Sequence, residues 1–210
     1  MALVESTSLF KGIVFKRLSA VEADANRSNQ HEFNGSKPLI GLFGEGPLKN
    51  VEAQFLLVPN SGEIVSAKSQ ITWYDARARH PTRTEFRLYY YDNAVTRLAR
   101  PGDLVIIGRK WDDAFFVLIT QGEGASAIYL SWLFGIEIEP GKAFVAIEHF
   151  DDTRFQAANK LSEFSEVGWQ PEGIPGVSDK GIELSVLLEL QRSLGLELNS
   201  ETAASWIADM

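Results

Sequence analysis

Residues 73–91 read WYDARARHPTRTEFRLYYY and hold four arginines, one glutamate and one histidine between positions 77 and 87. In an extended chain, alternate side chains share one face. One face is predicted to point outward: Arg83, Glu85, Arg87, Tyr89 and Tyr91. The other is predicted to point toward a core: Phe86, Leu88 and Tyr90. Pro81 lacks an N–H, which favours a turn before this segment. The stretch therefore predicts a hairpin arm with an arginine-rich outer face, and Arg77 and Arg79 alternate just before the turn.

Short apolar segments on both sides of the hairpin predict further strands. They are expected at residues 12–18, 39–44, 53–59, 64–73, 83–91, 104–107, 114–120 and 143–148. Gly, Pro and Asn separate them at intervals of about ten residues, as is typical of a small β-barrel or sandwich. Residues 125–134 predict a short helix over one end of the barrel. Residues 19–38 are polar and predict a loop of about twenty residues, a length that is usually functional or disordered.

The spacing of apolar residues changes after residue 150. Apolar residues with helical spacing predict one helix face: Ile182, Val186, Leu187, Leu190 and Leu194. Asp179 is the expected N-cap and Gly195 the expected stop. We expect this helix to pack onto the barrel or onto another domain. The chain is accordingly divided into a barrel domain, residues 1–150, and a helical extension, residues 151–210.

Composition excludes several classes of site. The chain of 210 residues has no cysteine, so disulfides, thiolate metal sites and a cysteine nucleophile are absent. The three histidines show no metal-ligand spacing, and no metal site is expected. The N-terminal residues lack the pattern of a signal peptide, and no apolar run reaches the roughly 18 residues of a membrane span. A soluble cytoplasmic protein is therefore predicted.

Charge is unevenly distributed along the chain. The net charge is -8, yet residues 1–100 carry 13 Lys and Arg against 10 Asp and Glu. Residues 136–210 carry 5 basic and 14 acidic side chains. Such an asymmetry indicates two separate roles or a solvated acidic tail. If the hairpin arm binds an anionic partner, the acidic residues 136–210 are expected to lie away from that partner.

The predicted outer face of the hairpin suits the major groove of duplex DNA. A two-stranded ribbon fits that groove, where Arg donates to guanine O6 and N7 and Glu accepts from cytosine N4. A carboxylate near phosphates is repulsive, so Glu85 favours base reading over simple phosphate attraction. Two other interpretations remain open. The strand is exposed and carries cross-strand Arg–Glu pairs, or the arginines clamp a phosphate or carboxylate ligand.

Two motifs also match a known family. The first is FKRLSA, residues 15–20, which opens the polar loop with His31 near its end. The second is YDARARHPTRTEFR, residues 74–87, in which six residues stand at the family's spacing: Tyr74, Arg77, Thr82, Arg83, Glu85 and Arg87. Over residues 12–135 the chain resembles the N-terminal effector domain of EcoRII-type restriction endonucleases, a DNA-binding pseudobarrel related to the plant B-three type. Arg79, Pro81 and Phe86 depart from the family's pattern.

This resemblance implies a mainly β fold, a pseudobarrel of seven or eight strands with short covering helices. It also implies two arms that grip the major groove of a CCWGG-type site. The first arm is residues 16–34, with candidates Lys16, Arg17, Asn26, Arg27, Asn29 and His31. The second arm is residues 77–87, with candidates Arg77, Arg79, Thr82, Arg83, Glu85 and Arg87. Arg83 and Glu85 are the best candidates for reading bases.

The resemblance further implies that catalysis belongs to another domain. In the family a separate C-terminal domain of the PD-(D/E)XK type cuts DNA with magnesium. The nearest candidates here are Glu139 with Lys142 and the acidic group Glu148, Asp151 and Asp152, and they lack the context that metal-assisted hydrolysis needs.

We therefore expect the chain to bind double-stranded DNA without cutting it or using a cofactor. It would be the effector domain of a type IIE-like restriction endonuclease, and magnesium would serve only its nuclease domain. The alternatives are a stand-alone DNA-binding regulator and an arginine-lined barrel for a small anion.

Overall fold

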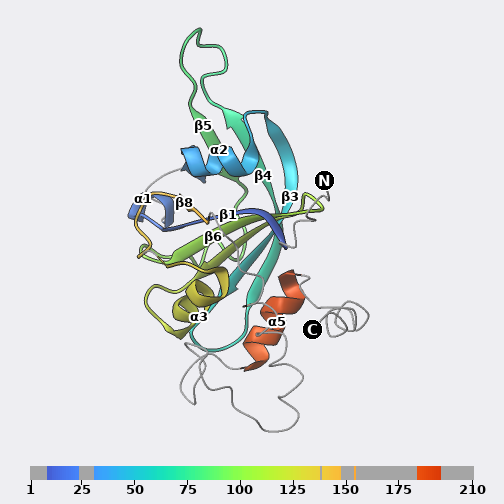
Figure 1. Ribbon diagram of the computed structural model, residues 1–210, viewed down its shortest axis with the longest axis vertical. Coiled ribbons are helices and arrows are strands. Elements are labelled where there is room, and N and C mark those ends of the chain that lie inside the picture. Colours follow the sequence, from blue (N-terminus) through green and yellow to red (C-terminus); the bar gives the residue numbers. More distant parts are fainter. Residues whose placement is uncertain (1–8, 24–30, 138, 148–153, 155–183, 195–210) are drawn as a thin grey trace, which may run out of the picture.

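The computed structural model describes residues 9–23, 31–137, 139–147, 154 and 184–194 (Figure 1). Within these ranges eight strands form one sheet, in the order β2-β5-β4-β3-β7-β6-β1-β8. The strands are β1 (Phe10–Arg17), β2 (Glu32–Asn34), β3 (Leu48–Val58), β4 (Val65–Asp75), β5 (Phe86–Tyr90), β6 (Leu104–Lys110), β7 (Phe115–Thr120) and β8 (Val145–Ala146). The helices are α1 (Ala20–Ala23), α2 (Lys37–Phe43), α3 (Ala125–Phe134) and α5 (Leu184–Leu194). The predicted mainly β fold with short helices is confirmed.

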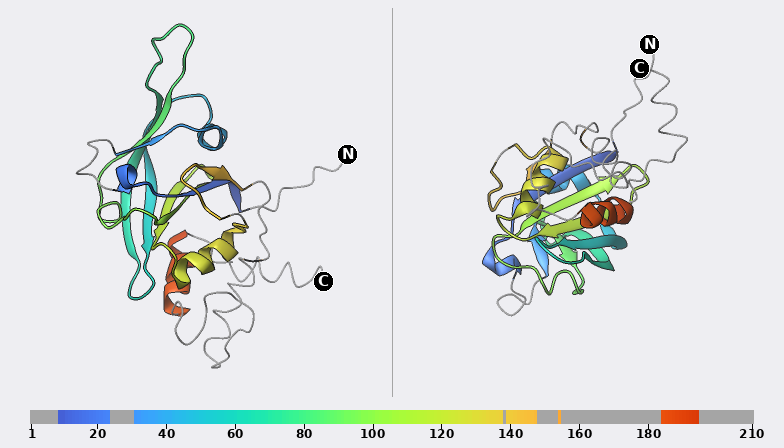
Figure 2. Two further views of the ribbon diagram at one scale, coloured as in Figure 1. Left: turned by 90° about the vertical axis from the view of Figure 1, so that its left-hand side faces the viewer. Right: turned by 90° about the horizontal axis from the view of Figure 1, so that it is seen from below.

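The sheet is antiparallel except where β3 and β7 pair in parallel. It curls strongly, so that β1 and β6 lie across from β4 and β5 in the views of Figure 2. The hairpin of β4 and β5 extends beyond the rest of the sheet, whereas α3 and α5 lie toward the opposite end (Figure 1). The fold therefore presents one protruding arm and keeps its larger helices away from it.

Both faces of the sheet are covered at β7, where every residue is buried. Phe116 and Leu118 belong to the apolar cluster that α3 and α5 cover. Val117 and Ile119 alternate with them and belong to the cluster that includes α2 and the β4–β5 hairpin. A strand buried on both faces reads as a continuous apolar run, because neither set of alternate side chains meets water.

The C-terminal helix packs onto the first of these clusters. Three residues of α5 lie in it with the strand residues: Val186, Leu190 and Leu194. The expected packing of this helix onto the barrel is confirmed for these residues. Asp179, Ile182 and Gly195 lie outside the described residues, and the division of the chain near residue 150 stays a prediction. None of the helices in the described ranges is long and apolar enough to cross a membrane.

One predicted strand is wrong. Residues 39–44 were expected to be extended, but residues 37–43 form α2. Ser36 is its N-cap residue, and Pro38 occupies the first turn, where its missing N–H costs nothing. Leu39, Leu42 and Phe43 are buried, at the spacing of one helix face. Two short elements, α1 and β2, also lie within the predicted loop of residues 19–38.

Candidate nucleic-acid interface

The second arm stands on a rigid aromatic base. The ring of Trp73 in β4 is fully buried and stacks on Phe86 in β5, with ring centroids 5.1 Å apart, and on Phe43, at 5.2 Å. Its Nε1–H donates to the carbonyl oxygen of Gly44 at 2.8 Å. Leu88 and Tyr90 are buried beside it, and the predicted core face of this segment is confirmed. The hairpin therefore projects from a fixed platform.

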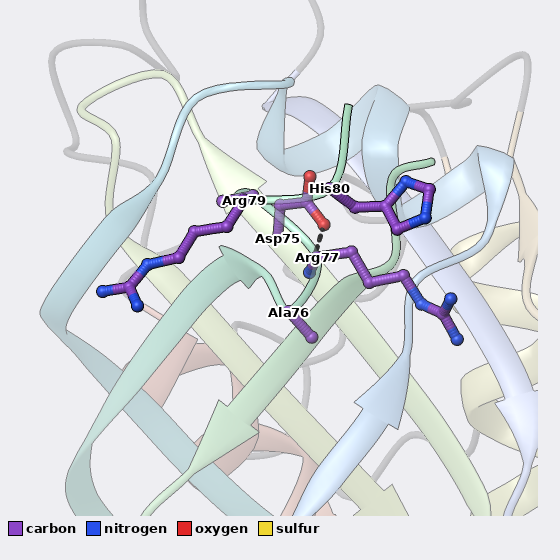
Figure 3. A pocket seen from close by; sticks show the side chains of 6 residues that line it. Asp75, Ala76, Arg77, Arg79 and His80 are labelled. Carbon is purple, nitrogen blue, oxygen red and sulfur yellow. Dashed lines mark hydrogen bonds between the residues drawn. The ribbon is translucent and has the colours of Figure 1, made fainter. Parts of the chain in front are cut away.

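Asp75 closes the neck of the hairpin loop. Its Oδ1 accepts hydrogen bonds from the backbone N–H of Arg77 at 2.8 Å and of Glu85 at 2.7 Å. The N–H of Ala76 donates to the carbonyl oxygen of Glu85 at 2.8 Å. Residues 75–80 line a hollow of about 440 Å³, where the side chains of Arg77 and Arg79 diverge to opposite sides (Figure 3). The loop thus presents two cations in different directions.

The predicted strand face of the second arm is partly wrong. β5 begins at Phe86, so Arg83 and Glu85 precede the strand, whereas Arg87 lies in it. Pro81 and the neighbouring polar residues form an exposed tip. Arg83 and Thr82 lie at this tip, and the N–H of Thr82 donates to Nδ1 of His80 at 3.2 Å. The alternation at period two was correct only from Phe86 onward.

Glu85 is the centre of an ion-pair chain. Its Oε2 accepts from Nε of Arg77, and its Oε1 accepts from Nη2 of Arg87 at 2.6 Å and from Nε at 3.2 Å. Nη1 of Arg87 donates to Oε2 of Glu32 at 2.7 Å, and the hydroxyl of Tyr74 donates to Oε1 of Glu32. The Arg–Glu pairs that the sequence left open are therefore present, and Arg77 and Arg87 are balanced by two carboxylates.

These contacts perturb the ionisable groups. Hydrogen bonds from Arg87 and then from Arg77 lower the pKa of Glu85 below its ordinary value, because they favour the charged carboxylate. Hydrogen bonds to Glu85 and then to Glu32 raise the pKa of Arg87. Burial, followed by the hydrogen bond to Glu32, raises the pKa of Tyr74 to about 12. At neutral pH the contacts therefore keep Glu85 and Arg87 charged and the Tyr74 hydroxyl protonated.

Arg79 and Arg83 stand apart from this network. Both are exposed, and across the described ranges neither side chain makes an ion pair or a hydrogen bond. They are the uncompensated cations of the arm. Arg79, which has no counterpart in the family's motif, thus shares the exposure of Arg83.

The first arm departs from its predicted role at Lys16. The residue is 4% exposed, and its ammonium donates to the Glu22 carboxylate at 2.6 and 2.7 Å. The ammonium also lies 5.0 Å from the ring centre of Phe144. Contact between Lys16 and DNA would break this buried pair, so Lys16 is an anchor for α1 and not a surface cation.

Arg17 points to the other face of β1. It donates to the carbonyl oxygens of Gly122 and, at 3.3 Å, Gly102, and it lies 3.6 Å from Glu139. Arg17 and Glu139 line a second hollow together with residues of α3, and α3 lies toward the end of the fold away from the hairpin tip (Figure 1). The structure therefore does not bring Arg17 together with the second arm.

The end of the first arm does meet the second arm. β2 pairs with β5, with Glu32 opposite Tyr89 and Asn34 opposite Arg87. The ring of His31 lies edge-on to that of Tyr90, with centroids 5.6 Å apart. Asn26, Arg27 and Asn29 lie outside the described residues. Sequence reasoning missed Glu32 and Asp75. An Asp at the end of a strand is a turn signal, because its carboxylate can accept from the backbone N–H two residues on, as that of Asp75 does. Nothing local in the sequence indicates Glu32.

No cluster of three or more potential metal ligands occurs among the described residues. Glu139 and Lys142 are exposed, and Glu148, Asp151 and Asp152 lie outside the described residues.

No protein-family model matches this chain, and no curated protein matches its sequence. A solved structure, a mutant UbaLAI restriction endonuclease B3 domain with cognate DNA, is similar at 17% identity and a TM-score of 0.33. The similarity covers 65% of this chain and 87% of that chain.

Proposed function

We propose that this chain binds double-stranded DNA sequence-specifically, with the second arm in the major groove. The observation that carries the proposal is the pair of exposed, uncompensated cations Arg79 and Arg83 on a protruding hairpin. The major groove, about 12 Å wide, admits a two-stranded ribbon. A protein of net charge -8 that exposes free arginines on one arm directs that arm toward an anionic partner.

The charged groups of the arm fall into two sets: Arg77 and Arg87 pair with Glu85, whereas within the described ranges Arg79 and Arg83 are unpaired. Arg79 and Arg83 diverge from the neutralised network, so they are free to donate to phosphates or to guanine O6 and N7. Thr82 lies between them at the exposed tip and offers a hydroxyl. The platform of Trp73 and Phe86 holds the loop, which lowers the cost of ordering it on binding. The same short segment would then supply both the contacts to DNA bases and the contacts to phosphates.

The wider role that we propose is recognition within a restriction endonuclease. The two sequence motifs support an effector domain of a type IIE-like enzyme for a CCWGG-type site. In that arrangement a separate nuclease domain supplies magnesium-dependent cleavage, and this chain supplies DNA binding. A stand-alone regulator would bind DNA in the same way, and the reading frame after residue 210 in the gene separates the two roles.

Selection of bound duplexes from a random pool tests the proposal. We expect one short site to be enriched and its binding to weaken with salt, by a slope of about 0.9 for each phosphate contact. Arg83→Ala and Arg79→Ala are expected to weaken binding. Lys68→Ala is the control, because Lys68 is also an exposed cation but lies in β4 and pairs with Glu52 at 3.2 Å.

Two outcomes would contradict the proposal. Binding without preference for any duplex would leave only non-specific attraction. Tight binding of inorganic phosphate or a small carboxylate at the arm, without duplex binding, would favour the rival of a small-anion site in the hollow of residues 75–80.

A further inference from the structure

Arg77 and Arg87 contact the same carboxylate in different ways. Arg77 donates to Glu85 through Nε alone, and among the described residues its Nη1 and Nη2 have no partner. The side chain of Arg77 is 45% exposed. Arg87, in contrast, uses Nε, Nη1 and Nη2 on Glu85 and Glu32, and its side chain is 24% exposed. One nitrogen of the Arg77 guanidinium has a partner, whereas all three nitrogens of the Arg87 guanidinium have one.

The free edge of Arg77 has the geometry of a base reader. A guanidinium presents its donors in a fixed fork, so a partner on Nε leaves the Nη1–Nη2 edge as a second pair of parallel donors. Guanine offers O6 and N7 as adjacent acceptors in the major groove, and an arginine that donates to both is the commonest specific contact. A carboxylate on Nε also restrains the long side chain before DNA arrives.

Glu85 is itself held from the opposite side. Its Oε1 accepts both donors of Arg87, and Arg87 is tied to Glu32 of β2. The side chain of Glu32 is 12% exposed. The carboxylate therefore cannot swing freely with Arg77, and it has no oxygen without a donor.

From these contacts we infer that Glu85 is a positioning residue that orients Arg77 to read a guanine. Glu85 fixes Nε of Arg77, so that Nη1 and Nη2 donate to O6 and N7 of one guanine. Arg87 and Glu32 hold Glu85 in place and do not touch DNA. This inference rests on the proposed function and deepens it, because it replaces the predicted cytosine-reading role of Glu85.

Affinities for the selected site and for its single-base-pair variants test the inference. Arg77→Ala is expected to lose about tenfold or more of the discrimination at one G·C pair. Glu85→Ala is expected to relax discrimination at that same pair, and to tighten non-specific binding because a negative charge is removed. The double variant is expected to lose no more discrimination than Arg77→Ala alone, since the two residues act as one unit.

Further variants separate orientation from charge and from folding. Arg77→Lys keeps the charge but lacks the fork, so we expect the salt slope to persist while discrimination at that pair is lost. Glu85→Gln retains an oxygen that accepts from Nε, and is expected to rescue part of the discrimination that Glu85→Ala loses. Glu52→Ala, which breaks the exposed pair with Lys68, is the control and should leave discrimination unchanged.

The outcomes distinguish two failures. If the unaltered chain prefers no duplex, the proposed function and this inference fall together. If it is selective, but Glu85→Ala relaxes a different base pair from Arg77→Ala and the two losses add, Glu85 reads its own base and only the inference is overturned. Discrimination that survives Arg77→Ala would also overturn it.

Discussion

Arg87 of β5 and Glu32 of β2 join the two arms, with Nη1 of the arginine 2.7 Å from Oε2 of the glutamate. The two residues lie 55 positions apart in the sequence and on adjacent strands of the sheet. Because Arg87 also holds Glu85, a single guanidinium connects the end of the first arm with the neck of the second. The arms are therefore expected to behave as one unit, and breaking this link should affect both.

Glu32→Ala tests the link between the arms. Because the pair is largely shielded, its removal is expected to lower the free energy of unfolding by about 1–3 kcal/mol. Denaturant unfolding measures the change. Glu52→Ala removes a carboxylate whose side chain is 68% exposed, and it should cost under about 1 kcal/mol. Equal small effects of the two variants would show that the cross-arm pair is energetically unimportant.

Tyr74 is expected to titrate late. Its ordinary pKa of 10.0 is raised to about 12, by burial first and then by Glu32. The folded state thus keeps the proton that the unfolded state has lost, so this contribution to stability is complete below pH 10 and is lost as pH rises toward 12.

Ultraviolet absorbance of the ionised phenol measures this titration as the difference between the unaltered chain and Tyr74→Phe. The difference is needed because burial also raises the pKa of Tyr90 to about 12. Removal of the carboxylate in Glu32→Gln should move the pKa of Tyr74 back toward its ordinary value. A Tyr74 that titrates at its ordinary value in the unaltered chain would show that its contact with Glu32 does not persist in solution.

Lys16→Met separates anchoring from DNA contact. The substitution leaves the Glu22 carboxylate without its cation, and the side chain of Glu22 is 14% exposed. We expect a loss of about 1–3 kcal/mol in the free energy of unfolding, because a shielded charge is left unpaired. Adding Glu22→Gln should recover part of it. The salt dependence of DNA binding should stay unchanged, and a slope reduced by about one contact would return Lys16 to the DNA surface.

Gly35 marks a close approach between the arms. A Cβ at this position would lie 2.4 Å from the carbonyl oxygen of Phe86, and the Gly35 N–H donates to that oxygen at 2.7 Å. Gly35→Ala is expected to push β2 away from β5, lowering stability by about 1–3 kcal/mol and weakening DNA binding.

The matched control for Gly35 is Gly41→Ala in α2. A Cβ there meets nothing within 4 Å, and we expect a gain of about 0.5–1 kcal/mol, because alanine favours a helix. Thermal unfolding and gel-shift titration measure both variants. Gly35→Ala with unchanged stability and binding would show that the β2–β5 contact is not needed.

The sequence predicted the elements whose pattern is local. Leu88 and Tyr90 alternate with polar neighbours, and their buried face is confirmed. Residues 125–134 form the expected helix. The strand predicted at residues 39–44 was wrong. A short apolar run with Gly and Pro is too short to show a period that separates a strand from a helix turn. Helix α2 is decided by its N-terminal residues and by burial against the sheet.

The candidate site was predictable in location but not in its internal pairing. The cluster at positions 77–87 indicated the arm directly. Whether an arginine is free or paired depends on residues that only the fold brings near, as with Glu32 beside Arg87. A single sequence without the register of β2 against β5 cannot show which cations are neutralised. Only the structure therefore shows that Arg79, which lies outside the family's motif, is exposed and unpaired among the described residues.

The closed neck at Asp75 has a consequence for how recognition can change. The Asp75 carboxylate and the bond between Ala76 and Glu85 secure the base of the loop, and the aromatic platform lies below them. Substitutions or insertions at residues 78–84 therefore need not disturb the core. The tip is a replaceable module: libraries confined to it offer a route to new target sites, and natural divergence can alter specificity there while the scaffold stays constant.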